Sequence, residues 1–212
     1  MAAAYTSLRV VTPPDAEPID IAVVRRHCRI DQTYDDDLLA MQLTTARQLA
    51  EQYLNRALMT QTLLYSWSST PPPTATPLVP QSLIIFPLNF PPLTRRAIEL
   101  PRAPVTEVKS VKWGPIDDMQ VADPDDYRLN LAIEPAQLLV RPQLIPILPQ
   151  QNLQIEYVAG YGDDPRIIPA GILQGILILT AHLYEHRGDA NPEFPDAAWL
   201  VMGMHRLWTF SG

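Results

Sequence analysis

The strongest candidate for catalytic chemistry is a pair of histidines near the C-terminal end of an apolar segment. His182 and His186 are one helical turn apart, with Glu185 between them, in the pattern His-x-x-Glu-His. On a helix this spacing places both imidazoles on one side, where they can bind zinc while the carboxylate acts as a base. One interpretation is therefore a zinc-dependent hydrolase. The candidates for a third ligand farther along the chain are Glu193, Asp196 and His205.

The same motif also has a structural interpretation. It occurs where the apolar helix must end, because Arg187 and Gly188 follow directly. Imidazole and guanidinium groups are favourable against the negative end of a helix without any metal. We favour this capping and packing role. The sequence then predicts no catalytic residue, no metal and no cofactor, and we expect that the protein is not an enzyme.

Two further patterns could bind phosphate or a cation, but neither has the spacing that this requires. Gly160 and Gly162 precede a helix, yet Pro165 replaces the third glycine of a dinucleotide-binding loop and no Lys-Ser/Thr pair follows. We interpret these glycines as a turn with positive φ. The acid pairs Asp125-Asp126 and Asp163-Asp164 are adjacent, whereas a calcium loop spaces its oxygen ligands apart. Solvated turns are the expected role of these acids.

Cysteine content and charge limit the function classes further. Cys28 is the only cysteine, so the chain has no internal disulfide framework, and nothing indicates secretion. The net charge is -7, whereas a protein that grips duplex DNA is expected to have a basic excess. Arg25, Arg26 and Arg29 gather on one segment, but a solvated helix face explains them more simply than a nucleic-acid contact. Tight DNA binding is therefore disfavoured.

No segment has the properties of a membrane span. The apolar run from Ala170 to Leu183 is shorter than the roughly 20 residues that cross a bilayer, and Gln174 and His182 interrupt it. The first ten residues lack the basic and apolar regions of a signal peptide. We expect no membrane contact.

Residues 1–59 have the pattern of two helices. Asp20 is placed to cap a short helix that breaks near Asp31. A longer helix follows, with acidic residues in its first turn, where carboxylates complement the positive helix end. Its apolar residues recur at steps of three and four: Leu38, Met41, Leu43, Ala46, Leu49, Ala50, Tyr53 and Leu54.

Residues 60–160 contain sixteen of the 23 prolines, which excludes long helices there. Strands and turns are expected instead, because several segments alternate in polarity or are β-branched. The candidate strands are Thr60–Ser68, Leu83–Phe86, Ala97–Leu100, Val105–Trp113, Tyr127–Leu131, Gln137–Val140 and Leu153–Val158. Thr70–Pro80 is rich in proline and threonine and is expected to be a loop or spacer. With helical regions on either side, the sequence predicts an α+β fold.

Residues 161–190 return to helix. The leucines and isoleucines between Ile168 and Leu183 lie on almost every side of this helix, which predicts burial all round, either inside the fold or against neighbouring subunits.

Residues 191–212 form a tail after a linker that contains Pro192 and Pro195. The tail either folds back on its own core or docks on a partner, because aromatic residues and Met are enriched at the centres of interfaces. We interpret it as a docking segment whose contact residues are Trp199, Met202, Leu207, Trp208 and Phe210.

Several short motifs resemble those of the head-tail connector (adaptor) proteins of long-tailed phages and gene transfer agents. Cys28-Arg29-Ile30-Asp31 is similar to the end of the family's first helix. The family's first clear hairpin is matched by Leu100–Val105 leading into Val108–Trp113, and its next turn and strand by Pro124–Leu129. The strand-turn-helix passage from Val158 and the ending Tyr184-Glu185-His186-Arg187 complete the similarity. Thr70–Pro80 and Pro87–Arg96 depart from the family pattern and look like insertions.

The resemblance implies a helical core, made by the N-terminal helix pair and the C-terminal helices, that is interrupted by a β-rich, proline-rich insertion. It implies a ring of about twelve copies beneath the portal protein, closed by rotational symmetry. The implied partners are the portal protein, neighbouring copies, and a stopper or tail-terminator protein. DNA is expected to pass through the channel without specific binding, and the tail segment to reach the portal. The implied location is the neck of a virion or phage-like particle assembled in the bacterial cytoplasm. A monomeric β-rich binding module is a further alternative.

Overall fold

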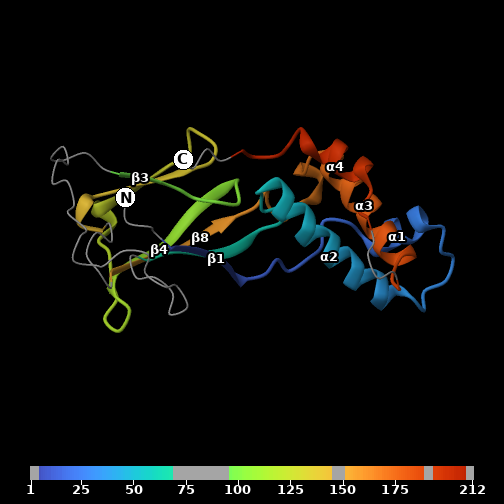
Figure 1. Ribbon diagram of the computed structural model, residues 1–212, viewed down its shortest axis with the longest axis horizontal. Helices are drawn as coiled ribbons and strands as arrows, with labels where there is room; N and C mark the ends of the chain where they lie inside the picture. The colour runs from blue at the N-terminus through green and yellow to red at the C-terminus, as the bar shows by residue number, and fades with distance from the viewer. Residues whose placement is uncertain (1–4, 69–95, 145–150, 189–192, 209–212) are drawn as a thin grey trace. The chain divides into compact units, whose positions relative to one another are not determined.

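The computed structural model describes residues 5–68, 96–144, 151–188 and 193–208. They form two compact units, each assembled from segments that are far apart in the sequence. We call them the β unit (residues 1–12, 62–101 and 105–158) and the helical unit (residues 13–61, 102–104 and 159–212). Figure 1 shows strands and helices that confirm the predicted α+β class.

The larger sheet of the β unit has five strands in the order β1-β2-β8-β4-β5. They are β1 (Tyr5–Thr12), β2 (Gln61–Ser68), β8 (Gln151–Ala159), β4 (Val105–Pro115) and β5 (Gln120–Val121). β1 runs antiparallel to β2, with Tyr5 opposite Ser68, and the register shifts between Val10 and Thr12. β4 and β5 are also antiparallel.

The smaller sheet has three antiparallel strands in the order β3-β7-β6. They are β3 (Arg96–Glu99), β7 (Gln137–Val140) and β6 (Tyr127–Asn130). Buried side chains alternate along the strands of both sheets, for example Leu138 and Val140 in β7, and Leu153, Ile155 and Tyr157 in β8. Each sheet therefore turns one apolar face to the interior, as period-two patterning requires. The hydroxyl of the buried Tyr157 donates to the carbonyl oxygen of Pro101 at 2.6 Å.

Six of the predicted strands overlap observed ones. The seventh, Leu83–Phe86, and the Thr70–Pro80 segment lie outside the described residues. Two observed strands, β1 and β5, were not predicted from the sequence.

The helical unit begins with the two predicted helices, α1 (Ile21–Cys28) and α2 (Asp36–Leu54). The side chain of Asp20 accepts a hydrogen bond from the backbone N–H of Ala22, which confirms the predicted cap. α2 has acidic residues in its first turn and ends at Asn55, which adopts the left-handed conformation. Its buried residues recur at helical spacing and face the core of this unit: Leu39, Leu43, Ala46, Ala50 and Leu54.

Two C-terminal helices complete the unit, α3 (Ala170–Glu185) and α4 (Asp196–Gly203). α2 packs extensively against α3, and α3 against α4, while α1 contacts both α2 and α3. Gly171 and Gly175 of α3 allow the close approach of α4. A Cβ atom at Gly171 would lie 2.9 Å from the Val201 carbonyl oxygen, and one at Gly175 would overlap Met202.

The described part of the helical unit buries one side of α3. Its fully buried residues are confined to that side: Ile172, Gly175, Ile176, Leu179 and Thr180. Ala170 and Gln174 are exposed, and Leu173 and Leu177 are only partly buried. Of the two alternatives left open by the sequence, burial on every side within the described part of the fold is therefore not observed, whereas packing against neighbouring subunits stays a prediction.

Candidate functional site

The two histidines of the His-x-x-Glu-His motif lie at the C-terminal end of α3. Their rings stack with centroids 4.2 Å apart, and Nδ1 of His186 lies 3.0 Å from the carbonyl oxygen of His182. His182 also packs against Phe194, with ring centroids 5.8 Å apart. These contacts match the predicted capping and packing role. Within the described residues, no group of three or more His, Cys, Asp or Glu side chains is arranged to hold a metal ion.

The glycine turn before α3 serves backbone packing. Gly160 and Gly162 have φ values of 137° and 130°, as the sequence predicts. The N–H of Gly160 donates to the carbonyl oxygen of Pro104 at 2.9 Å. A Cβ atom at Gly160 would overlap the Met59 carbonyl and lie 2.7 Å from the backbone nitrogen of Thr60. Gly160 therefore packs directly against the chain's own backbone, which explains why this position requires glycine.

The acidic turns are held by local hydrogen bonds. Asp123 accepts from the backbone N–H of Asp125 and caps a short 3₁₀ helix at Pro124–Asp126. Asp164 caps a second one at Pro165–Ile167 in the same way, and both of its oxygens contact the exposed Arg166. The hydrogen bonds from Arg166 lower the pKa of Asp164. These acids thus have the structural role of turn and cap residues.

The predicted docking residues fall into two groups. Met202 is fully buried against Gly175, and Trp199 is partly buried, with its ring centroid 4.8 Å from that of Tyr53. These two residues hold α4 on the helical unit. The backbone N–H of Leu207 donates to the Leu54 carbonyl oxygen, and Trp208 beyond it is 64% exposed. Phe210 lies outside the described residues.

Two exposed apolar side chains near the end of α4 were not identified from the sequence. Leu200 is 78% exposed on α4, and Met204, in the turn directly after α4, is 84% exposed. The guanidinium of Arg206 stacks 4.3 Å from the Trp208 ring centroid and 4.8 Å from that of Tyr53. This stacking gives the exposed Trp208 a defined position. Leu200 and Met204 are surrounded in the sequence by other apolar residues, so no local pattern distinguished them from the buried ones.

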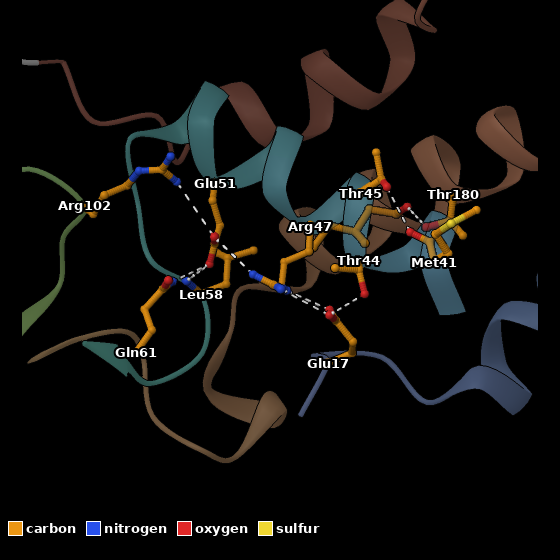
Figure 2. A network of polar contacts seen from close by, with 11 residues as sticks. Glu17, Met41, Thr44, Thr45, Arg47, Glu51, Leu58, Gln61, Arg102 and Thr180 are labelled. Atoms are coloured by element: carbon orange, nitrogen blue, oxygen red, sulfur yellow. Dashed lines mark hydrogen bonds and ion pairs between the residues drawn. The ribbon is translucent and has the colours of Figure 1, made fainter. Parts of the chain in front are cut away.

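A buried polar network connects distant segments of the helical unit, as Figure 2 shows. At its centre are Arg47 and Glu51 of α2, which are 5% and 4% exposed. The Arg47 side chain donates to both carboxylate oxygens of Glu17, at 2.7 and 3.2 Å, and to Glu51 at 3.2 Å. Glu17 also accepts from the hydroxyl of Thr44 at 2.8 Å.

The other side of Glu51 holds the segment that follows α2. One carboxylate oxygen accepts from the backbone N–H of Leu58 and from the Gln61 amide, both at 2.9 Å. The second oxygen lies 3.8 Å from the Arg102 guanidinium. Burial raises the pKa of the Glu51 carboxyl, and the Leu58 hydrogen bond and the charge of Arg47 oppose this shift. Because both of its oxygens are engaged within the protein, Glu51 is suited to a structural role and not to proton transfer.

The described part of the chain exposes several large apolar side chains, among them Leu200, Met204 and Trp208. Its helices also include none that is long and apolar enough to cross a membrane. The fold defines an α+β protein with a β unit and a helical unit, each built from separate segments of the chain.

Comparison with known proteins gives this architecture a family context. Residues 18–85 match the model of the phage gp6-like head-tail connector proteins, over a segment that contains α1, α2 and β2. No curated protein matches the chain significantly.

Solved structures with the same fold come from gene transfer agent (GTA) particles. A chain in the neck of an empty particle, computed with C6 symmetry, is 20% identical with a TM-score of 0.67. A chain in the virion of the native particle has 19% identity and the same TM-score. A chain in the native neck computed with C12 symmetry has 19% identity and a TM-score of 0.64. Each comparison covers 97% of this chain and 98% of the other. The family and fold matches confirm the resemblance to head-tail connectors.

Proposed function

We propose that this protein is a structural head-tail connector of a tailed phage or phage-like particle. The observation that carries the proposal is the fold similarity over 97% of the chain to proteins of the GTA neck and virion. The family match over residues 18–85 supports the same class independently. The partners of such a connector are the portal protein on one side and a stopper or tail-terminator protein on the other. Its location is the neck of the particle, after assembly in the bacterial cytoplasm.

The connector acts as a ring of about twelve copies that extends the DNA channel. The neck structures that share the fold were computed with C6 and C12 symmetry, which supports a ring for this chain as well. The net charge of -7 suits a channel through which DNA slides, because an acidic wall repels phosphate groups. The function is therefore architectural: the ring joins the filled head to the tail.

The portal contact is made by the C-terminal segment. Leu207, Trp208 and Phe210 follow α4, and Trp208 is exposed and held in place by Arg206. Leu200 on α4 and Met204 directly after it are further exposed apolar residues of this segment. Trp199 and Met202 act indirectly, because their packing fixes α4 on the helical unit. An exposed aromatic residue with apolar neighbours is the usual composition of an interface centre.

The test is a count of this chain in purified particles. We expect mass spectrometry to find about as many copies as of the portal protein, because matching rotational symmetry places one connector on each portal subunit. Electron microscopy of particles should place these copies at a single vertex. Cells that lack the protein should accumulate DNA-filled heads without tails. A few copies scattered over the shell, or a metal-dependent hydrolytic activity of the purified chain, would rule the proposal out.

A further inference from the structure

The outward face of α2 carries no charged side chain over most of the helix. Met41 is 59% exposed, Gln48 and Gln52 are exposed, and Thr45 is partly buried. These residues recur at steps of three and four, so they lie along one stripe. The two charged residues in the middle of α2, Arg47 and Glu51, are buried in the polar network. The stripe is thus uncharged in a chain whose net charge is -7.

α3 has a second uncharged face, which is more apolar. Ala170 and Gln174 are exposed on this face, and Leu173, Leu177 and Ala181 beside them are only partly buried. Ile167, just before the helix, is 59% exposed. No Asp, Glu, Lys or Arg occurs in α3 before Glu185. A helix this apolar is normally buried on every side. The described part of the helical unit, however, covers only one side of it.

The two faces point in opposite directions. α2 and α3 contact each other through their buried sides, which include Leu43 and Ala50 on α2, and Ile172 and Ile176 on α3. At 3.6 residues per turn, Gln48 and Gln174 each lie roughly half a turn from these contact residues. α1 and α4 each contact both central helices, so they occupy the grooves beside the pair. The outer faces of α2 and α3 remain as the uncovered sides.

Gln48 on α2 and Gln174 on α3 also lie at similar positions along the axis of the helix pair. Tyr184, near the end of α3, donates to Asp35, at the start of α2, so the two helices run antiparallel. At 1.5 Å per residue, Gln48 lies about 20 Å and Gln174 about 15 Å from that contact. A line through both glutamines thus crosses the helix pair almost at right angles.

We propose that the outer face of α3 in one copy packs on the outer face of α2 in the next copy. The inference rests on the proposed function, because a ring requires copies that contact one another. A head-to-tail contact uses two different patches on each subunit, and a rotation that closes turns such contacts into a ring. The α2 and α3 faces satisfy this requirement, since both are uncharged and lie on opposite sides of one packed helix pair. Their occupant is therefore a second copy of this chain.

Paired charges at Gln48 and Gln174 test this contact. In the Q48E/Q174K variant, each interface places opposite charges on the two faces, whereas Q48K/Q174K places like charges there. We expect particles with Q48E/Q174K to retain the wild-type number of copies. Particles with Q48K/Q174K should have about tenfold fewer, because facing like charges oppose association. Both positions are exposed in the isolated chain, so neither variant should alter its unfolding transition.

The matched control places the same lysine elsewhere on the helical unit. Gln32 is exposed in the loop between α1 and α2, outside both faces, so Q32K should leave the number of copies unchanged. Equal copy numbers for the two double variants would overturn the inference while leaving the connector function intact. If the wild-type chain is itself absent from the particle vertex, the proposed function fails and the inference fails with it.

Cysteine cross-linking gives a second readout. In a Cys28→Ala background, Q48C/Q174C particles should give a ladder of covalent oligomers on oxidation, because every copy then links to two neighbours. Q48C alone and Q174C alone should remain monomeric, since each places only one cysteine in an interface. A dimer with either single variant would indicate a two-fold contact and overturn the head-to-tail arrangement. A ladder that is absent from assembled particles would also contradict the proposal.

Discussion

At the scale of single residues, Glu51 is the centre of the helical unit's polar network. Its carboxylate connects α2 to Leu58, Gln61 and the Arg102 segment. These positions are far apart in the sequence or follow the end of a helix. The network therefore fixes how the chain leaves α2, which hydrophobic contacts alone do not specify. A buried charge has this effect only while all of its partners remain in place.

We expect Glu51→Ala to destabilise the protein by about 3–5 kcal/mol, because it leaves the buried Arg47 without part of its counter-charge. The measurement is the free energy of unfolding in denaturant. Gln52→Ala, on the exposed side of the same helix, is the matched control and should change it by less than about 0.5 kcal/mol. Similar values for the two variants would show that the network contributes little to stability.

The network could not be predicted from the sequence. Arg47 and Glu51 are spaced like an ordinary surface ion pair on a helix, a pattern that usually contributes little. Their burial depends on Glu17 and Arg102, which approach α2 only in the folded chain. The role of His186 at the end of α3 was predictable because its partner, the carbonyl of His182, is one turn away in the same helix.

At the scale of elements, local patterns predicted the helices well. The cap at Asp20 and the helical spacing from Leu43 to Leu54 are properties of neighbouring residues, and both were confirmed. In the first turns the prediction was wrong about which residues are buried, because Met41 is 59% exposed and the buried residue is Leu39. β1 was missed because Thr6–Thr12 is mostly exposed and its strand form depends on pairing with β2, about fifty or more residues later. β5 has only two residues and pairs with Lys112 and Trp113 of β4. Local sequence patterns thus do not reveal strands that form only by pairing with residues distant in the sequence.

The C-terminal segment demonstrates the same limit for the candidate site. Its apolar residues share one composition, yet Met202 faces the core and Trp208 faces solvent. What separates them is Gly175, whose missing side chain makes room for Met202. The sequence favoured a tail separate from the main body, whereas this packing leads us to expect that α4 is needed for the fold.

Two truncations test the division of this segment. Ending the chain at Pro195 removes α4 and Met202. It should destabilise the helical unit by more than about 3 kcal/mol, because the fully buried side chain of Met202 is lost from the core. Ending it at Leu207 removes only Trp208 and the residues after it, and should leave the unfolding transition nearly unchanged. Only the second truncation should give a folded chain that no longer joins portal-containing heads. Calorimetry and particle composition measure the two effects.

The control for docking is an exposed apolar residue of the β unit. Leu200→Ser and Met204→Ser should weaken incorporation into particles, whereas Ile116→Ser should not, although Ile116 is 73% exposed. If all three variants are incorporated equally, the exposed apolar residues near the end of α4 are not the portal contact. Surfaces near the N-terminal helices are then the next candidates.

At the scale of the whole molecule, composition and order of elements carried the prediction of class. The proline content distinguished the β region from the helical regions on either side of it. The resemblance to the head-tail connector family implied that these helical regions form one core. Net charge added a functional constraint that no single site provides. With 23 acidic and 16 basic residues, the chain has no general attraction for phosphate. The proposed channel role requires a ring that surrounds DNA without holding it.

The purified chain should therefore bind duplex DNA weakly at any sequence. Non-specific binding proteins reach dissociation constants of about 10⁻⁴–10⁻⁶ M at physiological salt through released counterions. We expect weaker binding than this, because acidic residues outnumber basic ones and repel the DNA backbone. Fluorescence anisotropy with a labelled duplex measures the affinity at low and physiological salt. Replacing the exposed Asp117 and Asp118 with lysine reduces the net negative charge and should increase the affinity, with a steeper salt dependence. Tight, sequence-selective binding by the unmodified chain would contradict a channel role, because a wall that holds DNA would obstruct its passage from head to tail.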